Sequence, residues 1–490
     1  MLTPPHAETN PQGKFDFNRK AREEMVHEGF QPDFPAQVIS EVNSAQAAPI
    51  QNGPGCDLRS LLWSSIDNTD SRDLDQVEWA ERLPNGNIRV LVGIADVDAV
   101  VGSHSATDSH ASANATSVYT GGPVFPMLPE RLSTDLTSLG QDADRRAIVM
   151  EFVVSAGGDV VCADLCAAML RNKARLNYDQ VASWLQAPPQ SGLPADLRQQ
   201  LLLQQEASQR LKTFRKERGA LAFGDLESVP IVVNNSMRGF DMVRQTPARD
   251  IIESFMVAAN VAMARFLRAQ NSLCLRRVVR TPKRWDRIQA IAAGTGTKLP
   301  DAPDSKALSE FLAARKEVDP DHFPELSLAV LKSLGPGEYV AEQPGDEHEG
   351  HFGLAVEDYT HSTAPNRRYA DLIMQRLLKA AIHRIPSPYS EGQLSDLAAH
   401  CTEREAAARH VERFMKKVAA ALMLGPQVGG TFDAIVTGVS PKGTFARLLA
   451  VPAEGRIVRG DKGLDVGQKT RVRLLSVDPQ RGFIDFQTAP

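Results

Sequence analysis

Little in this sequence points to an extracellular or membrane-bound protein. Its five cysteines are scattered along the chain and odd in number, which argues against a disulfide framework and is typical of a reducing compartment. The first residues contain no apolar run of the kind that a signal peptide requires. No apolar run approaches the roughly 18 residues of a membrane helix. We therefore expect a cytoplasmic protein that does not bind membranes.

The chain also lacks a large net charge. Its formal charge is −5 over 490 residues, which by itself does not indicate a polyanionic partner. Residues 425–490 differ from the rest, because they hold nine Lys or Arg against six Asp or Glu. Local clefts, and not the net charge, decide whether a protein binds a polyanion. The distribution therefore leaves nucleic-acid binding open.

Acidic residues gather in one short stretch, residues 64–77 (SSIDNTDSRDLDQV). Four aspartates lie within nine residues, and the last two are two positions apart, so an extended chain would present them on one face. Two carboxylates about 4 Å apart repel by roughly 4 kcal/mol at an effective dielectric constant near 20. A fold that gathers them must supply protons or cations, and oxygen ligands suit Mg²⁺ or Mn²⁺. An acidic surface turn is the alternative interpretation. The four residues are Asp67, Asp70, Asp73 and Asp75.

A β-hairpin is predicted directly after this stretch. Asn85-Gly86 separates the run VEWAERL from an almost continuously apolar return strand, and Asn-Gly is a strong hairpin signal. If the turn is centred on these two residues, Asp75 faces Asp96 and Asp73 faces Asp98. This register predicts four carboxylates at one end of the hairpin.

The chain divides into three predicted parts, of overall class α+β. Residues 1–50 form an N-terminal segment with short helices at 17–28 and 34–45, either a helix–turn–helix pair or a packing appendage. Residues 51–424 mix strands with helices, including an amphipathic helix over 249–270. Residues 425–490 contain five short strands separated by Gly and Pro, which predicts a small barrel of the OB type or a generic β-barrel. In the OB case, Phe432 and Phe445 would be available for base stacking.

Several blocks resemble the ribonuclease II / ribonuclease R (RNB) family of 3′→5′ exoribonucleases. IDNTDSRDLDQ (66–76) resembles its aspartate signature, and HFGLAVEDYTHSTAPNRRYADLIMQRLL (351–378) resembles its second signature. Residues 126–139 and 251–267 resemble two further blocks, and the terminal barrel resembles the S1-type RNA-binding domain. The resemblance covers roughly residues 57–490. It implies an RNB-type catalytic domain, a mixed β-sheet with packed helices, over 51–424, followed by an S1-type OB-fold barrel over 425–490.

The family pattern carries over to most of the aspartates. Asp67, Asp73 and Asp75 fall on its first three aspartates, and the fourth position holds Gln76. The resemblance implies that these residues hold Mg²⁺, with Mn²⁺ as a substitute. The Gln76 amide can ligate a cation but brings no negative charge. From the predicted register we expect Asp98 to supply the missing charge, directly or through a metal-bound water; the alternative is a solvated carboxylate at the end of the strand. Asp96 would lie at the same site, but the resemblance implies an acidic residue there in any case, so Asp96 cannot by itself make up the deficit.

The resemblance also implies roles in RNA binding. Tyr119 is expected to stack on the 3′-terminal base, Arg367 to contact the scissile phosphate with Arg368 beside it, and Glu253 to be the acidic residue of the helix block. Arg368 has a second interpretation, an ion pair with Asp371 on its own helix. For His351 and His361, structural roles are favoured over catalytic ones.

The implied activity is metal-dependent, processive hydrolysis of single-stranded RNA from its 3′ end to nucleoside 5′-monophosphates. Catalysis is assigned to Asp73, Asp75 and Arg367, and the protein is expected to be monomeric. The alternative is a catalytically impaired RNB-fold protein that binds RNA as a factor, which is suggested only by Gln76.

Overall fold

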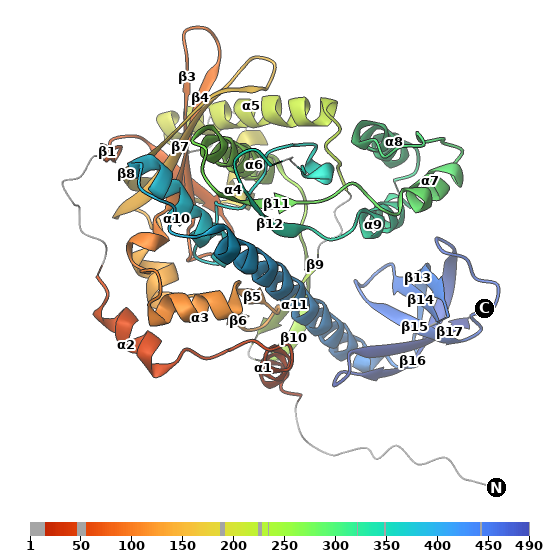
Figure 1. Ribbon diagram of the computed structural model, residues 1–490. Coiled ribbons are helices and arrows are strands. Elements are labelled where there is room, and N and C mark those ends of the chain that lie inside the picture. Colours follow the sequence, from red (N-terminus) through yellow and green to blue (C-terminus); the bar gives the residue numbers. More distant parts are fainter. Residues whose placement is uncertain are drawn as a thin grey trace.

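The computed structural model describes residues 15–46, 55–186, 192–223, 228–233, 235–320, 322–346, 349–441 and 443–489. A long helix, α11 (Glu391–Leu424), crosses the molecule from the region of the large sheet to the C-terminal barrel (Figure 1). Residues 46–56, whose Gly, Pro and Asn content predicts a linker, lie mostly outside the described residues. No helix in the described part of the chain is long and apolar enough to cross a membrane.

The largest sheet has six strands in the order β1-β8-β2-β3-β4-β7, with an additional pairing between β7 and β8. β4 is the apolar return strand of the predicted hairpin, and it pairs with β3 on one side and β7 on the other. Its central position explains its apolar composition. A strand with a neighbour on each edge and with both faces buried has no solvent-exposed face, so polar and apolar residues do not alternate along it. The strands are β1 (Cys56–Asp57), β2 (Trp63–Asp67), β3 (Gln76–Arg82), β4 (Ile88–Ala95), β7 (Asp144–Val154) and β8 (Val160–Asn177).

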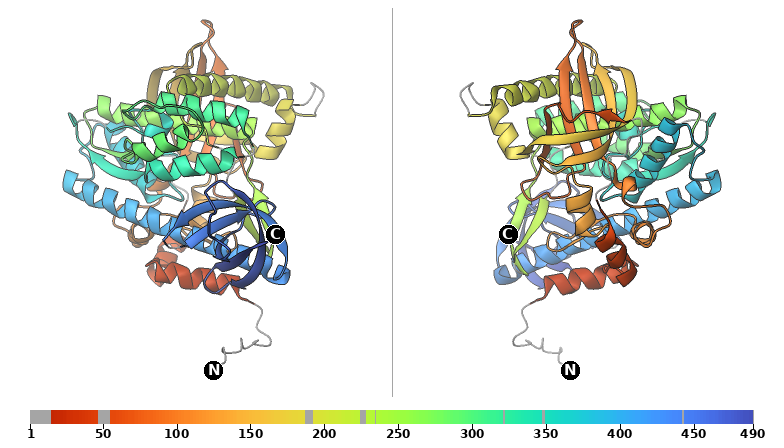
Figure 2. Two further views of the ribbon diagram at one scale, coloured as in Figure 1. Left: turned by 90° about the vertical axis from the view of Figure 1, so that its right-hand side faces the viewer. Right: turned by 90° about the vertical axis from the view of Figure 1, so that its left-hand side faces the viewer.

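Helices cover this sheet, and α5 lies across its strands in the side views (Figure 2). The amphipathic helix predicted over 249–270 is confirmed as α6 (Pro247–Ala269). Thr246 caps α6 by accepting a hydrogen bond from the Arg249 N–H, and Pro247 occupies its first turn. The other helices near the sheet are α4 (Tyr178–Gln186), α5 (Ala195–Glu217) and α10 (Tyr369–His383).

Two smaller units flank the sheet. Helices α7 (Trp285–Ala293), α8 (Ser305–Val318) and α9 (Phe323–Leu334) share a hydrophobic core of their own. Beside them, β11 (Cys274–Val278) pairs with β12 (Glu338–Glu342). Both units lie in the sequence between α6 and the second signature segment (351–378). They therefore help to position the first residues of that segment.

The predicted C-terminal barrel is confirmed as a closed barrel in the order β13-β14-β15-β17-β16. Along β14, Thr444, Ala446 and Leu448 are buried and the residues between them are not, as expected for a strand with one face in a barrel core. Phe432 packs partly against that core. The strands are β13 (Thr431–Ser440), β14 (Gly443–Leu448), β15 (Glu454–Arg459), β16 (Lys469–Asp478) and β17 (Phe483–Ala489).

The two helices predicted near the N-terminus are α1 (Phe17–His27) and α2 (Ala36–Ser44). α1 packs on α11, whereas α2 packs on α3 (Ala106–Asn114) and on η2 (Arg131–Leu136). Since each helix docks on a different element, the arrangement favours the packing appendage over an independent helix–turn–helix module.

The predicted hairpin forms, but its predicted register is wrong by one residue. Gln76 pairs with Ile94 and Arg82 with Ile88. The turn is longer than two residues, because the Leu83 N–H donates to the Asn87 carbonyl. The turn is therefore centred on residue 85. A shift of one residue moves side chains to the opposite face of a strand, so Asp96 does not face Asp75.

A chain of aromatic and histidine rings supports the second signature segment. The His351 ring nitrogen Nδ1 accepts a hydrogen bond from the Leu354 N–H, and its ring packs edge-on against Tyr359. Tyr359 in turn contacts His361, whose Nδ1 lies 2.8 Å from the Tyr339 hydroxyl oxygen. Burial, assisted by nearby Arg277, lowers the pKa of His351 to about 4. These contacts agree with the structural role predicted for both histidines.

We predict that His351→Gln reduces the loss of stability in acid. A histidine with a pKa near 6.5 in the unfolded chain and about 4 when folded makes the unfolded state bind more protons. Stability is then fully present above about pH 6.5 and is lost as pH falls toward 4. Urea unfolding between pH 5 and 7.5 should show a pH slope that is lower by nearly one proton in the variant. Identical slopes for the variant and the parent would contradict this assignment.

Candidate active site

The two signature segments meet at Asp75. This carboxylate is 2% exposed, and its Oδ1 accepts hydrogen bonds from the Asn366 backbone N–H (3.1 Å) and side-chain Nδ2 (2.9 Å). Asn366 is itself held by the Thr137 hydroxyl, which donates to its Oδ1 at 2.6 Å. The hydrogen bonds to Asn366 thus satisfy one carboxylate oxygen and fix the orientation of the other.

Burial is the main influence on the pKa values of two of these aspartates. Burial raises the pKa of Asp75 to about 7, an effect that Arg367 opposes and that Asp73 increases. Burial also raises the pKa of Asp73, again against Arg367 and together with Asp67. Asp67 ends β2 and accepts hydrogen bonds from the Asn68 N–H and the Ser71 hydroxyl. The structure therefore gathers the first three aspartates of the signature.

Arg367 and Tyr119 lie beside the carboxylates. The Arg367 Nε is 3.8 Å from Asp75 Oδ2, and half of its side chain (50%) is exposed. Its carbonyl accepts a hydrogen bond from the Ser117 N–H, which places the short strand β5 (Val118–Tyr119) next to it. Tyr119 and Arg367 both line a cavity of about 250 Å³. The sequence predicted both residues for this site.

Helix α11 supplies site residues that the sequence reasoning missed. Glu405, Arg409 and Glu412 line the same cavity, and Glu412 Oε1 accepts a hydrogen bond from the Tyr119 N–H at 3.0 Å. Their spacings of four and three residues place them on one face of the helix. That spacing was the available signal, but it could not be recognised without knowing which face of α11 meets the site.

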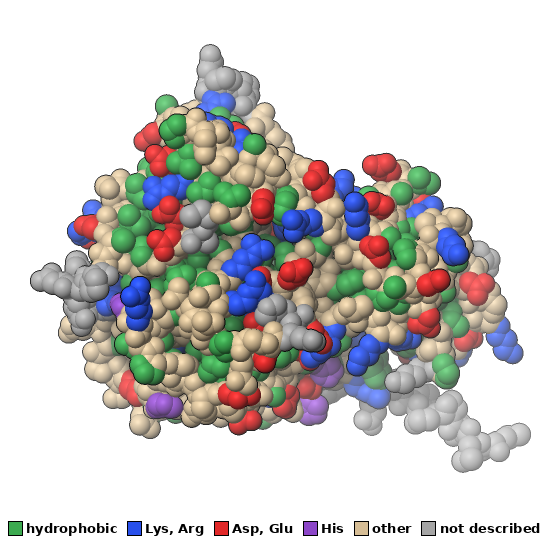
Figure 3. Space-filling model, turned by 45° about the horizontal axis from the view of Figure 1, so that its top comes forward, with side chains coloured by type: hydrophobic (Ala, Val, Ile, Leu, Met, Phe, Trp, Pro, Cys, Tyr) green, Lys and Arg blue, Asp and Glu red, His purple; other side chains and the backbone are tan. Residues whose placement is uncertain are grey.

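A second cavity, of about 650 Å³, adjoins the first. Its lining includes His351, Leu334 and Arg413, together with Arg409, which also lines the first cavity. The space-filling view shows Lys and Arg side chains gathered near the middle of one hollowed face (Figure 3). Guanidinium groups placed along adjoining cavities are suited to a bound phosphate chain.

The fourth signature position has an unexpected neighbour. Gln76 begins β3 and is buried, and Glu78 follows it on the same face of the strand, fully buried. Neither Glu78 carboxylate oxygen has a hydrogen-bond partner among the described residues. Ser64 lies opposite Glu78 on the neighbouring strand β2, and its hydroxyl also has no hydrogen-bond partner there. Burial, with the charge of Asp67, raises the pKa of Glu78 well above its usual value. A glutamate inside an apolar strand was a visible signal that the sequence reasoning did not use.

The residue types at this site suit a hard divalent cation, although in the described chain the carboxylate oxygens of Asp67, Asp73 and Asp75 do not all lie within 4.8 Å of one another. They are carboxylate oxygens, of which those of Asp75 are buried and those of Asp67 and Asp73 are half-buried, and the nearby Glu78 has no hydrogen-bond partner in the described chain. Mg²⁺ and Mn²⁺ prefer such oxygen ligands. Asp67, Asp73 and Asp75 are the residues that would hold the cation.

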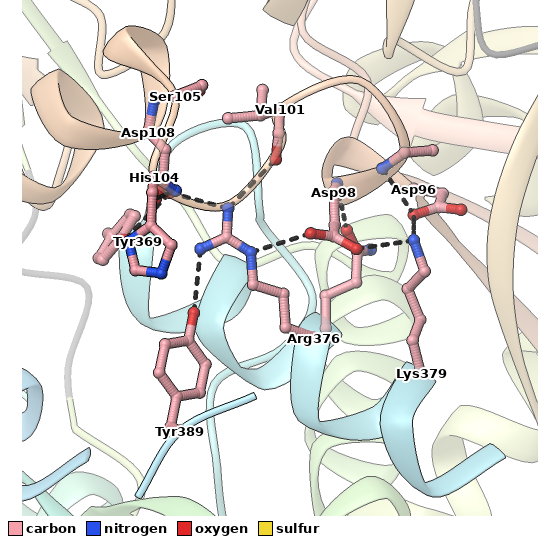
Figure 4. A network of polar contacts seen from close by, with 12 residues as sticks. Asp96, Asp98, Val101, His104, Ser105, Asp108, Tyr369, Arg376, Lys379 and Tyr389 are labelled. Atoms are coloured by element: carbon pink, nitrogen blue, oxygen red, sulfur yellow. Dashed lines mark hydrogen bonds and ion pairs between the residues drawn. The ribbon is translucent and has the colours of Figure 1, made fainter. Parts of the chain in front are cut away.

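Asp96 and Asp98 point elsewhere, toward α10 (Figure 4). Lys379 Nζ lies 2.9 Å from Asp96 Oδ1 and 2.8 Å from Asp98 Oδ2. Arg376 Nε contacts Asp98 at 2.9 Å, and Arg146 contacts Asp96 at 3.3 Å. The predicted replacement of the missing charge by Asp98 is therefore not supported: the register differs by one residue, and both carboxylates are already neutralised.

The remaining predicted residues are distributed as follows. Arg368 donates to Asp371 Oδ1 at 2.8 Å, as its second interpretation required, and it still lines the first cavity. Glu253 is exposed on α6 and contacts Arg215 and Gln245, and the described contacts do not join it to the aspartates. Phe432 and Phe445 are half-buried in the barrel, which is not part of either cavity lining.

Comparison with known families identifies both parts of the chain. Residues 56–384 match the RNB domain, and residues 430–489 match the RNase II-type exonuclease C-terminal S1 domain. Ribonuclease R 1 of Lactococcus lactis is 30% identical over 497 residues, which cover 94% of this chain and 59% of that protein. Ribonuclease R of Thermotoga maritima is 28% identical over 93% of this chain and 68% of its own length.

Solved structures show the same fold. Mycoplasma genitalium RNase R in complex with ribose-methylated single-stranded RNA superposes with a TM-score of 0.87 at 24% identity, over 97% of this chain and 78% of that one. Yeast Ssd1, a pseudonuclease, superposes with a TM-score of 0.72 at 17% identity, over 92% of this chain and 56% of that one. With an RNB model matching most of its length, this chain belongs to the RNB-domain family.

Proposed function

We propose that this protein is a metal-dependent 3′→5′ exoribonuclease that hydrolyses single-stranded RNA processively to nucleoside 5′-monophosphates. The observation that carries the proposal is the buried Asp75 carboxylate, oriented by Asn366 and with Arg367 3.8 Å away, beside a cavity that Tyr119 lines. Membership of the RNB-domain family supports it, as do relatives named Ribonuclease R.

The residues of the site would divide the chemistry as follows. Mg²⁺, or Mn²⁺ in its place, would when bound supply the activation of water and the stabilisation of charge on the leaving oxygen. Asp67, Asp73 and Asp75 would hold the cation, and Asn366, which donates to Asp75 Oδ1, would keep Oδ2 turned toward the reacting phosphate. Arg367 donates to that phosphate, where a charged donor stabilises developing negative charge.

The shape of the site supports action at a 3′ end. Tyr119 stacks on the terminal base, and its backbone is held by Glu412 of α11. The nucleotides behind it occupy the larger cavity beyond Arg409, with Arg413 facing their phosphates. Stacking at about 1–3 kcal/mol per base is indifferent to sequence, as a processive enzyme requires.

The proposal also covers the domain boundaries, the cellular location and the oligomeric state of the protein. We propose an N-terminal segment over 1–50, a catalytic domain over 51–424 and an RNA-binding barrel over 425–490; the end of α11 at Leu424 supports the second boundary. The protein acts as a monomer in the cytoplasm.

A catalytically impaired RNA-binding factor is the second candidate. Its support is Gln76 and the likeness in fold to a pseudonuclease. Retention of Asp67, Asp73, Asp75 and Arg367 favours the enzyme, because a protein that only binds RNA has no need to bury carboxylates that repel each other.

The variant Asp75→Asn tests catalysis directly. It preserves shape but removes the charge that would hold the cation, so shortening of 5′-labelled single-stranded RNA should be lost while RNA binding is retained. Asp70→Asn is the matched control, because Asp70 is exposed in the same loop and should retain parental activity. Digestion by Asp75→Asn at the parental rate would show that this is not the active site.

The variant Gln76→Asp tests the cation site. It adds a carboxylate beside the proposed ligands, so a lower Mg²⁺ concentration should give half-maximal activity. By contrast, Asp98→Ser breaks an ion pair with Arg376 and should lower the melting temperature without changing the Mg²⁺ requirement. If Asp98→Ser needed more Mg²⁺ for half-maximal activity, Asp98 would contribute charge to the cation site after all, and its ion pairs with α10 would not be its main role.

Replacing barrel cations tests the RNA-binding role of residues 425–490. Arg456, Arg459 and Lys462 are exposed, and their joint replacement by Gln removes charge without disturbing the barrel core. Affinity for long single-stranded RNA should fall, and the dependence of log K on log salt should flatten by about 0.7 for each phosphate that the barrel no longer neutralises. An unchanged slope would mean that these side chains do not bind RNA.

A further inference from the structure

Helix α1 packs against the short strand that carries Tyr119. Val118, the neighbour of Tyr119 in β5, is fully buried. It shares one hydrophobic cluster with Phe17 of α1 and with Met415 of α11. The side chain of Tyr119, by contrast, is 42% exposed. Because successive side chains of a strand point to opposite faces, α1 and α11 cover the side of β5 that faces away from the Tyr119 ring.

The loop that follows Tyr119 contains two glycines, and each has a close neighbour. Gly121 has a φ of +82°, and a Cβ atom on it would lie 2.7 Å from the Pro230 ring. A Cβ atom on Gly122 would lie 2.8 Å from two ring carbons of Phe17. Carbon atoms that are not bonded pack best at about 3.5–4.0 Å, so neither position has room for a side chain. The glycines therefore allow Phe17 and Pro230 to contact the loop directly.

Backbone hydrogen bonds hold the same loop from two further elements. In β9 (Ser228–Val233), the Val232 N–H donates to the Gly121 carbonyl at 3.3 Å. In α11, Glu412 Oε1 accepts a hydrogen bond from the Tyr119 N–H at 3.0 Å. The loop is thus held by α1, β9 and α11, none of which adjoins it in the sequence.

The first turn of α1 is itself anchored, which fixes the position of Phe17. Asn235 lies in the turn between β9 and β10 (Ser236–Met242), and its Oδ1 accepts a hydrogen bond from the Asn18 N–H at 3.0 Å. Its Nδ2 donates to Asp16 Oδ1 at 2.9 Å. Phe17 lies between these two anchored residues and is 1% exposed. Its ring therefore presents a fixed surface to the loop.

We propose that α1 forms part of the site that binds the 3′ end of RNA. Phe17 acts as a positioning residue: it holds the loop at Gly122, and thereby holds Tyr119 where its ring can stack on the terminal base. A ring that is already in place loses little conformational freedom when the base binds. The inference rests on the proposed function, in which Tyr119 stacks on that base. It adds a contribution from outside the RNB match, which begins at residue 56.

The test compares the binding of two RNAs to the full chain in the presence of a chelator. One RNA is intact, and the other lacks only its 3′-terminal base. In the parent, loss of that base should weaken binding by at least about fivefold, the lower end of the range for base–aromatic stacking. Tyr119→Ala and Phe17→Ala should each bring this ratio close to one. The affinity for the RNA without its terminal base should remain at the parental value in both variants.

A control variant and a rescue separate positioning from general stability. Val38→Ala removes buried apolar atoms from α2, which packs on α3 and η2, so it should lower the melting temperature and leave the ratio unchanged. Gly122→Ala places a methyl group against the Phe17 ring and should lower the ratio. Adding Phe17→Leu to Gly122→Ala makes room for that methyl group and should restore at least part of the ratio. Two changes that only destabilised the fold would add and would not compensate.

The outcomes distinguish this inference from the proposed function. A parental ratio near one, or a ratio that Tyr119→Ala leaves unchanged, would show that Tyr119 does not stack on the terminal base, and both would then be wrong on this point. If Tyr119→Ala removes the ratio but Phe17→Ala and Gly122→Ala keep it, the stacking role of Tyr119 stands and the positioning role of α1 is overturned. The positioning role also fails if Phe17→Leu gives no rescue of Gly122→Ala.

Discussion

The hydrogen bonds between Asp75 and Asn366 are the interaction on which the rest of the site depends. They join segments separated by 291 residues and bury a carboxylate that has one arginine 3.8 Å away as its ion-pair partner. Burying a charge without full compensation is expensive. Asn366 reduces that cost because its two hydrogen bonds satisfy Asp75 Oδ1, and they also orient Oδ2. What remains is a local excess of negative charge, which a divalent cation would neutralise.

Helix α11 connects this site to the other parts of the molecule. Its middle turns present Glu405, Arg409 and Glu412 to the first cavity, and His410 on a neighbouring position meets α1. Its C-terminal residues Ala420, Ala421 and Leu424 belong to the core of the barrel. A single rigid element thus fixes the distance between the site and the module proposed to bind RNA. Loops alone would not fix that distance.

Local patterns were enough to predict the elements, but not the contacts between them. The hairpin, the amphipathic helix α6 and the five barrel strands followed from residue periodicity and turn residues. The register failed because the bond between Leu83 and Asn87 lengthens the turn. Asp98 was misplaced because its partners, Arg376 and Lys379, lie 278 and 281 residues away. Local signals existed for Glu78 and for the Glu405 face of α11, but only the fold shows that Glu78 is buried without a hydrogen-bond partner in the described chain and that this face of α11 meets the site.

The most direct test is whether Asp67, Asp73 and Asp75 bind a divalent cation in the absence of RNA. Electron paramagnetic resonance of Mn²⁺ added to the chelator-treated protein measures this binding, with the Asp75→Asn variant as the control. We expect Mn²⁺ binding that Mg²⁺ displaces competitively and that raises the melting temperature. Mn²⁺ that remains free in solution, with no change in melting temperature, would contradict the assignment of these aspartates as cation ligands.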